Sequence, residues 1–266
     1  MKTLVHNGEL GEIQVGSRSN RYVTISIDDG DVSDFRTAEL LNKYGLQATF
    51  YIPARNSERP VMSASQVREL SANFEVGAHT LNHTPLKSLP DAQAWMEIAE
   101  GKKWLEDTIG KAAVSFCYPR GKFNASTPEL VKQAGFLGGR TCLFNLHGFP
   151  RNPFLWGVST HAYSHSKAIQ LRHAILERNF AGMFNFARTY NWSTDWQQHF
   201  LHGLTHVERR GGIAHLYLHS WEIDELGQWV QLEAVFAAIS RQRCISKVTN
   251  GSLFQLWRAE NDNGRN

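Results

Sequence analysis

The sequence places two adjacent carboxylates, Asp28 and Asp29, where an apolar run ends and directly before Gly30. The preceding residues 22–25 are β-branched and aromatic, which predicts a buried strand. In α/β folds, functional side chains gather at the carboxyl ends of such strands. Neighbouring side chains on a strand point to opposite faces, so both carboxylates can meet one ligand only if the turn redirects one of them. Alternatively, the pair caps a helix that begins near Asp34.

A histidine pair follows the next strand-like run, residues 74–78. His79 and His83 are four positions apart. If the segment is helical, they lie on one face, where two imidazoles can chelate one metal ion. With an aspartate from the first strand end, they form a ligand set that suits Zn²⁺ with an open coordination position. A water at such an ion is acidified, and the second carboxylate is then available as a general base.

Three other histidine pairs have the same spacing: His161/His165, His202/His206 and His215/His219. The last pair falls in a strand-like segment, where positions four apart are separated by about 13 Å. The second pair lies in a predicted helix, and an exposed polar stripe is its simpler interpretation. The first pair follows an apolar run at 154–158 that predicts a strand. It stays a candidate, although the sequence near it offers no carboxylate.

Four blocks occur in an order that resembles the polysaccharide deacetylases: residues 26–30, 79–83, 116–121 and 216–219. They read Ser-Ile-Asp-Asp-Gly, His-Thr-Leu-Asn-His, Phe-Cys-Tyr-Pro-Arg-Gly and Leu-Tyr-Leu-His. The resemblance is to the chitooligosaccharide-deacetylase-like group of carbohydrate esterase family four, and it spans residues 20–222. It implies an α/β fold, a distorted (β/α) barrel of the polysaccharide deacetylase type with fewer than eight strands.

The resemblance also implies a role for each residue of the candidate site. The general base is Asp28, the metal ligands are Asp29, His79 and His83, the general acid is His219, and the backbone N–H that meets the oxyanion is that of Arg120. Pro119, Trp221 and Glu222 are expected to line the substrate site. Trp221 would form a wall of the sugar pocket, and Glu222 would orient His219. A packing or surface role is the alternative for each.

The sequence departs from the family pattern at three places. Many members carry an arginine that holds the base, and this chain has Cys117 at that position. Ile27 replaces the usual phenylalanine before the two carboxylates, a tolerated apolar exchange. The Asp-Trp block is missing at its expected spacing, because Asp195-Trp196 comes far too late. The sequence therefore leaves open which group orients Asp28.

The composition is that of an ordinary globular enzyme, with 266 residues, 42% of them hydrophobic and 20% charged. We expect one catalytic domain over residues 1–259 and a polar tail at 260–266. A net charge of +3 makes no case for nucleic acid, and three cysteines form no even disulfide framework. Residues 1–15 contain no apolar run, which predicts neither a signal peptide nor a transmembrane segment and favours the cytoplasm.

Strand-like and helix-like segments alternate, which predicts parallel strands with helices outside. Helices are expected at 34–44, 63–71, 91–109 and 127–135, and strands at 48–52 and 113–117. Ser63 and Gln66 have the spacing of a capping box. In the longest helix, the expected core contacts are Trp95, Ile98, Leu105 and Ile109.

An aromatic stretch between residues 161 and 212 has several interpretations. It contains Phe180, Phe184, Phe186, Tyr190, Trp192 and Trp196. Core packing is the simplest of them, since the spacing is helical. A platform for sugar rings, a lid over the site and a subunit contact are the alternatives.

The sequence as a whole predicts a metal-dependent hydrolase, with one divalent ion, zinc, that removes an N-acetyl group from a sugar. The expected substrate is an intracellular glycan precursor, nucleotide- or lipid-linked, of cell-envelope or O-antigen (lipopolysaccharide) synthesis. The cation of Arg120 favours a substrate with negative charge. The alternatives are an allantoinase-like ring-amide hydrolase and a sugar-binding pseudo-deacetylase. The identity of the sugar, the native metal and the oligomeric state stay open.

Overall fold

The computed structural model of the protein describes residues 20–263. Residues 1–15, for which the sequence predicts no signal peptide, lie outside this range. The last three residues of the predicted tail also lie outside it. The strands are β1 (Arg21–Asp28), β2 (Thr49–Ile52), β3 (Glu75–Ala78), β4 (Ser115–Cys117), β5 (Gly138–Arg140), β6 (Thr160–His161), β7 (Gly212–Leu218) and β8 (Ser246–Lys247).

The α-helices are α1 (Asp34–Lys43), α2 (Ala64–Ser71), α3 (Asp91–Ile109), α4 (Thr127–Gln133), α5 (Lys167–Leu176), α6 (Phe180–Arg188), α7 (Trp196–Arg210), α8 (Ser220–Glu225), α9 (Trp229–Arg241) and α10 (Asn250–Asn263). Short 3-10 turns, η1 (Leu86–Ser88) and η2 (Pro119–Gly121), complete the described part of the chain. No helix within residues 20–263 combines the length and the apolar character needed to cross a membrane.

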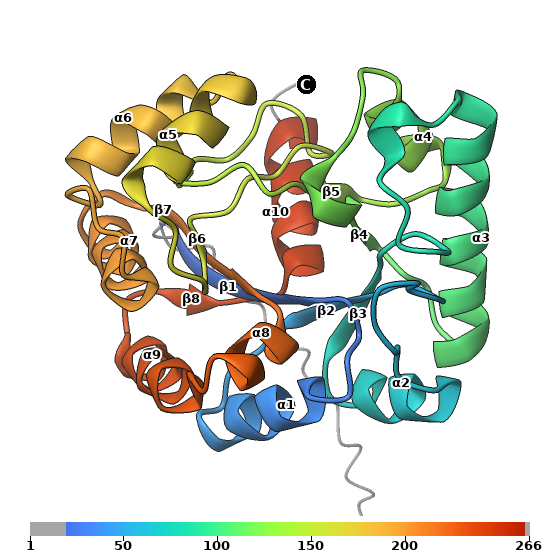
Figure 1. Cartoon of the computed structure of the whole chain (residues 1–266), viewed down its shortest axis with the longest axis horizontal. Helices are drawn as coiled ribbons and strands as arrows, with labels where there is room; N and C mark the ends of the chain where they lie inside the picture. The colour runs from blue at the N-terminus through green and yellow to red at the C-terminus, as the bar shows by residue number, and fades with distance from the viewer. Residues whose placement is uncertain (1–19, 264–266) are drawn as a thin grey trace, which may run out of the picture.

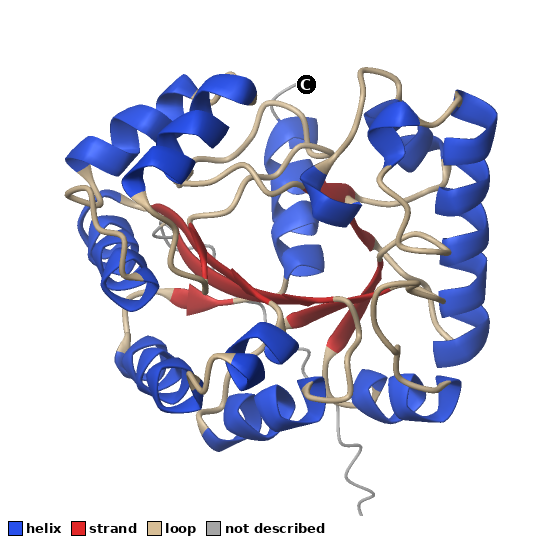
Figure 2. Ribbon diagram, in the orientation of Figure 1, coloured by secondary structure: helices blue, strands red, loops and turns tan. Residues whose placement is uncertain are grey.

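The strands form one curved, parallel sheet (Figures 1 and 2). Seven of them follow the order β5-β4-β3-β2-β1-β7-β6, and the two-residue β8 pairs with β1 beside this path. The central strand β1 aligns Asp28 with Tyr51 of β2 and Ile27 with Leu218 of β7. Most of the helices lie around the outer side of the sheet. The predicted distorted barrel, with fewer than eight strands along its path, is confirmed.

The segment 156–161 spans the gap between the two ends of this path. Trp156 pairs with Arg140 of β5 in a single parallel bridge, and β6 then pairs with β7. The strand predicted at 154–158 is therefore wrong, because only this bridge forms there. The backbone hydrogen bonds of this segment go to different partners and not to one neighbouring strand. The Thr141 N–H donates to the Trp156 carbonyl, and the Val158 N–H donates to the Leu143 carbonyl.

Helix α10 covers the amino ends of the strands, opposite the candidate site. Asn250 accepts from the Thr24 hydroxyl and donates to that of Tyr51. The ring of Phe254 lies on Gly138, where a Cβ atom would come within 2.5 Å of it. The helix continues to Asn263, so the tail expected from residue 260 is helical over its first four positions.

Local sequence signals place most helices correctly. The capping box of Ser63 and Gln66 forms at the start of α2. Helix α3 has the predicted bounds, and Ile98 and Leu105 are buried in the core. The prediction for Trp95 is wrong, because its side chain is 38% exposed. The neighbouring Ala94 faces the core instead, and one helical residue of rotation turns Trp95 outward.

Candidate active site

Residues from distant parts of the chain meet at the carboxyl ends of the strands. Asp28 ends β1, and the next two residues have positive φ angles, 79° at Asp29 and 68° at Gly30. This turn brings the second carboxylate back to the side of the first. His79 Nε2 lies 4.0 Å from Asp28 Oδ2 and 3.7 Å from Asp29 Oδ1. The redirection expected from sequence is confirmed, and neither carboxylate caps α1, which follows Ser33.

Asp29, His79 and His83 converge as a possible ligand set for a cation. One ligand atom from each lies within 4.8 Å of the others. The segment is a turn and not the helix that the spacing suggested, and positive φ angles at Thr80 (67°) and His83 (56°) bring the imidazoles together. His83 Nε2 is 3.1 Å from Asp29 Oδ1.

The protonation pattern of this cluster fits a metal. His79 Nδ1 lies 2.9 Å from the Cys117 carbonyl and donates to it, so Nε2 carries the lone pair of a neutral ring. Burial lowers the pKa of His79, which favours that neutral form. His79 Nε2 and Asp29 Oδ1 are buried and lack a hydrogen-bond partner among the described residues. A divalent cation shared by these two atoms would satisfy both of them.

Trp221 of α8 reaches the same carboxylate. Its indole Nε1 donates to Asp29 Oδ2 at 3.0 Å. The guanidinium of Arg59 lies 3.4 Å from the centroid of the Trp221 ring and covers one face. Burial opposes the ionisation of Asp29, but the contacts with His79 and His83 outweigh it and hold the pKa of this carboxyl below its usual range. Asp29 is therefore ionised, which is the form in which a carboxylate can bind a metal ion.

Arg140 is the site residue that the sequence analysis missed. It ends β5, is fully buried, and donates through one guanidinium nitrogen to both oxygens of Asp28. Burial alone would raise the pKa of Asp28, and the Arg140 charge instead holds it below its usual range. Cys117 also contacts this carboxylate, with Sγ 3.6 Å from Oδ2. An arginine from another strand thus replaces the one absent at the Cys117 position.

A signal for Arg140 was present in the sequence. The alternation of strands and helices predicts a strand after α4. Arg140 follows the Gly138-Gly139 pair and stands where that strand would end. The strand is short and glycine-rich, so it lacks the β-branched run that marks the others. Gly139 is required because a Cβ there would lie 3.0 Å from the Tyr118 ring.

His219 begins a chain of polar contacts that leads away from the ligand cluster. Its Nε2 lies 3.8 Å from Asp29 Oδ2, and its Nδ1 donates to Glu222 Oε2 at 2.7 Å. The same carboxylate oxygen lies 2.9 Å from His161 Nε2, and His161 Nδ1 lies 3.1 Å from His165 Nε2. Burial would lower the pKa of His219, but the carboxylates of Glu222 and Asp29 raise it to about 9.

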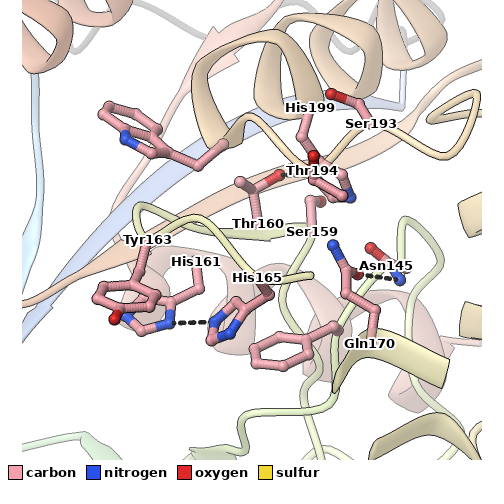
Figure 3. A pocket seen from close by; sticks show the side chains of 12 residues that line it. Asn145, Ser159, Thr160, His161, Tyr163, His165, Gln170, Ser193, Thr194 and His199 are labelled. Atoms are coloured by element: carbon pink, nitrogen blue, oxygen red, sulfur yellow. Dashed lines mark hydrogen bonds between the residues drawn. The ribbon is translucent and has the colours of Figure 1, made fainter. Parts of the chain in front are cut away.

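The His161/His165 pair thus has a carboxylate beside it, contrary to the expectation from sequence. Glu222 comes from α8, which the topology brings next to β6. Behind the pair lies a small polar cavity (Figure 3) with a volume of about 10 Å³, the size of one water molecule. Asn145 and His199 line it, and their Oδ1 and Nε2 atoms lack partners among the described residues.

The two remaining pairs do not form ligand sets. His202 and His206 are half-buried and not an exposed stripe, with His206 stacked on His147 at 4.7 Å between ring centroids. His215 is buried within β7 and lies 2.9 Å from the Ser26 hydroxyl through Nε2, while His219 stands past the end of that strand.

The Pro119–Gly121 turn follows the carboxyl end of β4, the strand next to β3 in the sheet. Pro119 is buried, and Arg120 has a positive φ of 54°, which sets the direction of its backbone N–H. The Arg120 side chain is exposed and pairs with Glu58, so the structure does not bring its cation into the cluster. The carboxylate of Glu58 also compensates much of the positive charge of Arg120, on which the expectation of an anionic substrate was based.

Comparison with known proteins shows which proteins this chain is similar to. Residues 16–138 match the family model described as polysaccharide deacetylase. The predicted likeness to polysaccharide deacetylases is confirmed. The chain is 28% identical over 155 residues to a peptidoglycan-N-acetylglucosamine deacetylase of Bacillus cereus. This alignment covers 56% of this chain and 70% of the relative. It is also 28% identical over 116 residues to a peptidoglycan deacetylase of Helicobacter pylori, which covers 44% of this chain and 39% of that relative.

Solved structures share the deacetylase fold along most of the chain. A candidate polysaccharide deacetylase from Mycobacterium smegmatis superposes with a TM-score of 0.62 at 14% identity, over 93% of this chain and 94% of that one. A family 4 acetyl xylan esterase from Clostridium thermocellum, in complex with a cobalt ion, gives a TM-score of 0.56 at 17% identity, over 89% and 91%. At these identities the likeness establishes the fold.

Proposed function

We propose that the protein is a metal-dependent hydrolase that removes the acetyl group from an N-acetylated sugar. The observation that carries the proposal is the arrangement of Asp28 and Asp29, which share one turn but differ in partners. Asp29 faces His79 and His83, and its Oδ1 atom has no hydrogen-bond partner among the described residues. Asp28 instead faces the buried guanidinium of Arg140. One carboxylate is thus arranged to hold a cation and the other to accept a proton.

Asp29, His79 and His83 would hold the metal ion, expected to be zinc. When bound, the ion would polarise the acetyl carbonyl and lower the pKa of a nearby water. The cobalt ion bound by the acetyl xylan esterase of similar fold supports a divalent ion in this architecture. The choice between zinc and another ion stays a prediction.

In the proposed reaction, water adds to the acetyl carbon and the C–N bond breaks. Asp28, kept ionised and oriented by Arg140, accepts the proton of the attacking water. His219, protonated at neutral pH and held by Glu222, gives a proton to the departing amine. The products are acetate and a free amino sugar. The Arg120 N–H is proposed to meet the oxyanion.

The substrate class rests on the relatives and on the site together. Both curated relatives are named as peptidoglycan deacetylases, which supports an acetylated amino sugar as substrate. Trp221, Glu222 and Pro119 remain proposed substrate neighbours, although Trp221 and Glu222 already have contacts within the protein. A nucleotide- or lipid-linked precursor of cell-envelope or O-antigen synthesis, and a cytoplasmic location, also remain proposals.

The experiment is acetate release from a panel of substrates by metal-loaded protein. The panel contains neutral chitooligosaccharides, nucleotide-linked N-acetyl sugars and lipid-linked N-acetyl sugars, with the His79→Ala variant as the inactive control. We expect acetate from at least one sugar and none from the variant. Turnover of allantoin with no acetate from any sugar would instead assign a ring-amide hydrolase. Metal binding without any turnover would assign a pseudo-deacetylase.

A further inference from the structure

Helices α5 and α6 expose large apolar side chains to solvent. Leu176 is 70% exposed, and Ile175, Phe180 and Phe184 are each about 60% exposed. The core interpretation of the aromatic stretch is therefore only half right. Phe186, Tyr190 and Trp196 are buried, but Phe180 and Phe184 are not. A cluster of this kind on one helical pair marks an interaction surface.

The two helices are attached to the rest of the fold by few buried residues. Helix α5 buries only Ala174, and α6 buries Gly182 and Phe186. By contrast, α9 buries five of its thirteen residues. Figure 1 shows α5 and α6 side by side on the outside of the fold. The large apolar side chains that these helices expose are therefore largely uncovered by the described part of the chain.

The same surface is basic. The side chains of Lys167, Arg172, Arg178 and Arg188 are exposed, and none of them forms an ion pair with another residue in 20–263. The one acidic residue of the two helices and their connection, Glu177, pairs with Lys122 at 3.2 Å. Arg188 and Phe184 lie one turn apart, with the guanidinium 5.5 Å from the ring centroid. Apolar and cationic groups are therefore interleaved on one surface.

This surface adjoins the candidate active site. The Glu177–Lys122 pair joins the end of α5 to the residue that follows the Pro119–Gly121 turn. On the other side, Phe144 stacks on His173 of α5 and on His161, with centroids 6.1 and 6.4 Å apart. His161 in turn contacts Glu222, the partner of His219. Helix α5 is therefore linked to the residues around His219 through Phe144 and His161.

We propose that the α5–α6 surface (Lys167–Arg188) binds an anionic lipid bilayer, which presents a lipid-linked acetylated sugar to the site. Exposed apolar side chains interleaved with unpaired cations are the pattern of a helix that lies in a membrane interface. A neutral protein partner would not need the four cations. The lipid-linked substrate rests on the proposed function, whereas bilayer binding stands on the surface alone.

The test is co-sedimentation of the full-length protein with vesicles of phosphatidylcholine, with and without phosphatidylglycerol. We expect binding to the anionic vesicles that weakens as salt is added. The Leu176→Gln/Phe180→Gln variant is expected to bind on the order of tenfold more weakly, because it loses two exposed apolar side chains that would insert into the bilayer. Arg172→Glu/Arg178→Glu should also bind more weakly.

The matched control is Met96→Gln/Val230→Gln, which changes two equally exposed apolar residues on α3 and α9. It should bind vesicles as the wild type does. Absence of wild-type binding, or an equal loss in the control, would overturn the inference. The inference would also be overturned if a variant of the α5–α6 surface bound vesicles like the wild type but was a monomer where the wild type is a dimer. The surface would then be an interface between two copies of this chain.

Catalysis and docking are separated by two further measurements. Asp28→Asn should bind vesicles like the wild type, because docking does not require the base. Leu176→Gln/Phe180→Gln should keep acetate release from a water-soluble N-acetyl sugar, which also shows that it is folded, and lose release from a sugar carried in a vesicle. Equal release from both substrates by this variant would contradict the inference but leave the proposed function intact.

Discussion

Arg140 and Asp28 form a fully buried ion pair across the barrel, although 112 positions separate them in the chain. The guanidinium also lies near the rings of Tyr217 and Tyr51, 4.6 and 5.4 Å from their centroids. The pair thus fixes the carboxylate proposed as general base. It also answers the question raised by Cys117, because the orienting arginine comes from β5.

Arg140→Met should lower kcat by on the order of 10²-fold with little change in bound metal, because Asp28 loses its orientation while the ligands stay in place. It should also destabilise the fold by about 3–5 kcal/mol, the usual cost of leaving one buried charge unpaired. Acetate release, metal analysis and urea unfolding measure the three effects. Arg140→Lys, which keeps the charge, is the control for stability, and an active Arg140→Met enzyme would show that Asp28 needs no such partner.

Asp28→Asn and Asp29→Asn should differ in metal content. The first variant is expected to keep the ion and lose about 10²–10⁴-fold in rate, the range of a general base. The second should lose the ion as well, since its carboxylate faces His79 and His83. Metal analysis of both purified variants, alongside acetate release, decides this. Equal metal loss in the two would contradict the assigned division of labour.

Cys117→Ala should keep activity within a few-fold of the wild type. The thiol contacts Asp28, but Arg140 already fixes that carboxylate. Burial raises the pKa of Cys117 well above its ordinary value, so the thiolate does not form at neutral pH. Mild alkylation should therefore modify the exposed Cys244 first and leave the rate unchanged. Inactivation that follows modification of Cys117 would give this residue a chemical role.

Stability should fall as the pH drops below about 6.5, in part through His199. Burial lowers the pKa of His199 to about 3, against an ordinary value near 6.5. Between these values the unfolded chain binds the proton and the folded chain does not, so acid favours unfolding. His199→Gln should reduce the slope of unfolding free energy against pH by up to about 1.4 kcal/mol per unit. Urea titrations over this range measure the slopes, and identical slopes would refute the assignment.

The sequence was sufficient for the strands and helices with strong local patterns. The β-branched run before Asp28 and the capping box at Ser63 act within a few residues, and both form as expected. The apolar run at 154–158 failed as a strand because its backbone partners are set by the gap between β5 and β7. That gap is a property of the whole barrel.

In the candidate site, too, the residues of a local motif could be predicted from the sequence, whereas contacts between distant segments could not. The spacing of Asp28, Asp29, His79 and His83 identifies the cluster, although a turn replaces the expected helix. The pairing of Arg140 with Asp28 and the contact between His161 and Glu222 could not be read from spacing, because each joins residues from separate strands and helices. Such contacts depend on strand order, which the chain specifies only through its complete packing.

The most direct measurement of the central claim is acetate release as a function of bound metal. The protein is stripped of metal, reloaded with increasing amounts of zinc, and assayed on an N-acetylated amino-sugar substrate, with His79→Ala in parallel. The account predicts no release without metal, full activity at one bound ion per chain, and neither metal nor activity in the variant. Undiminished acetate release by the metal-free protein, or by His79→Ala, would contradict it.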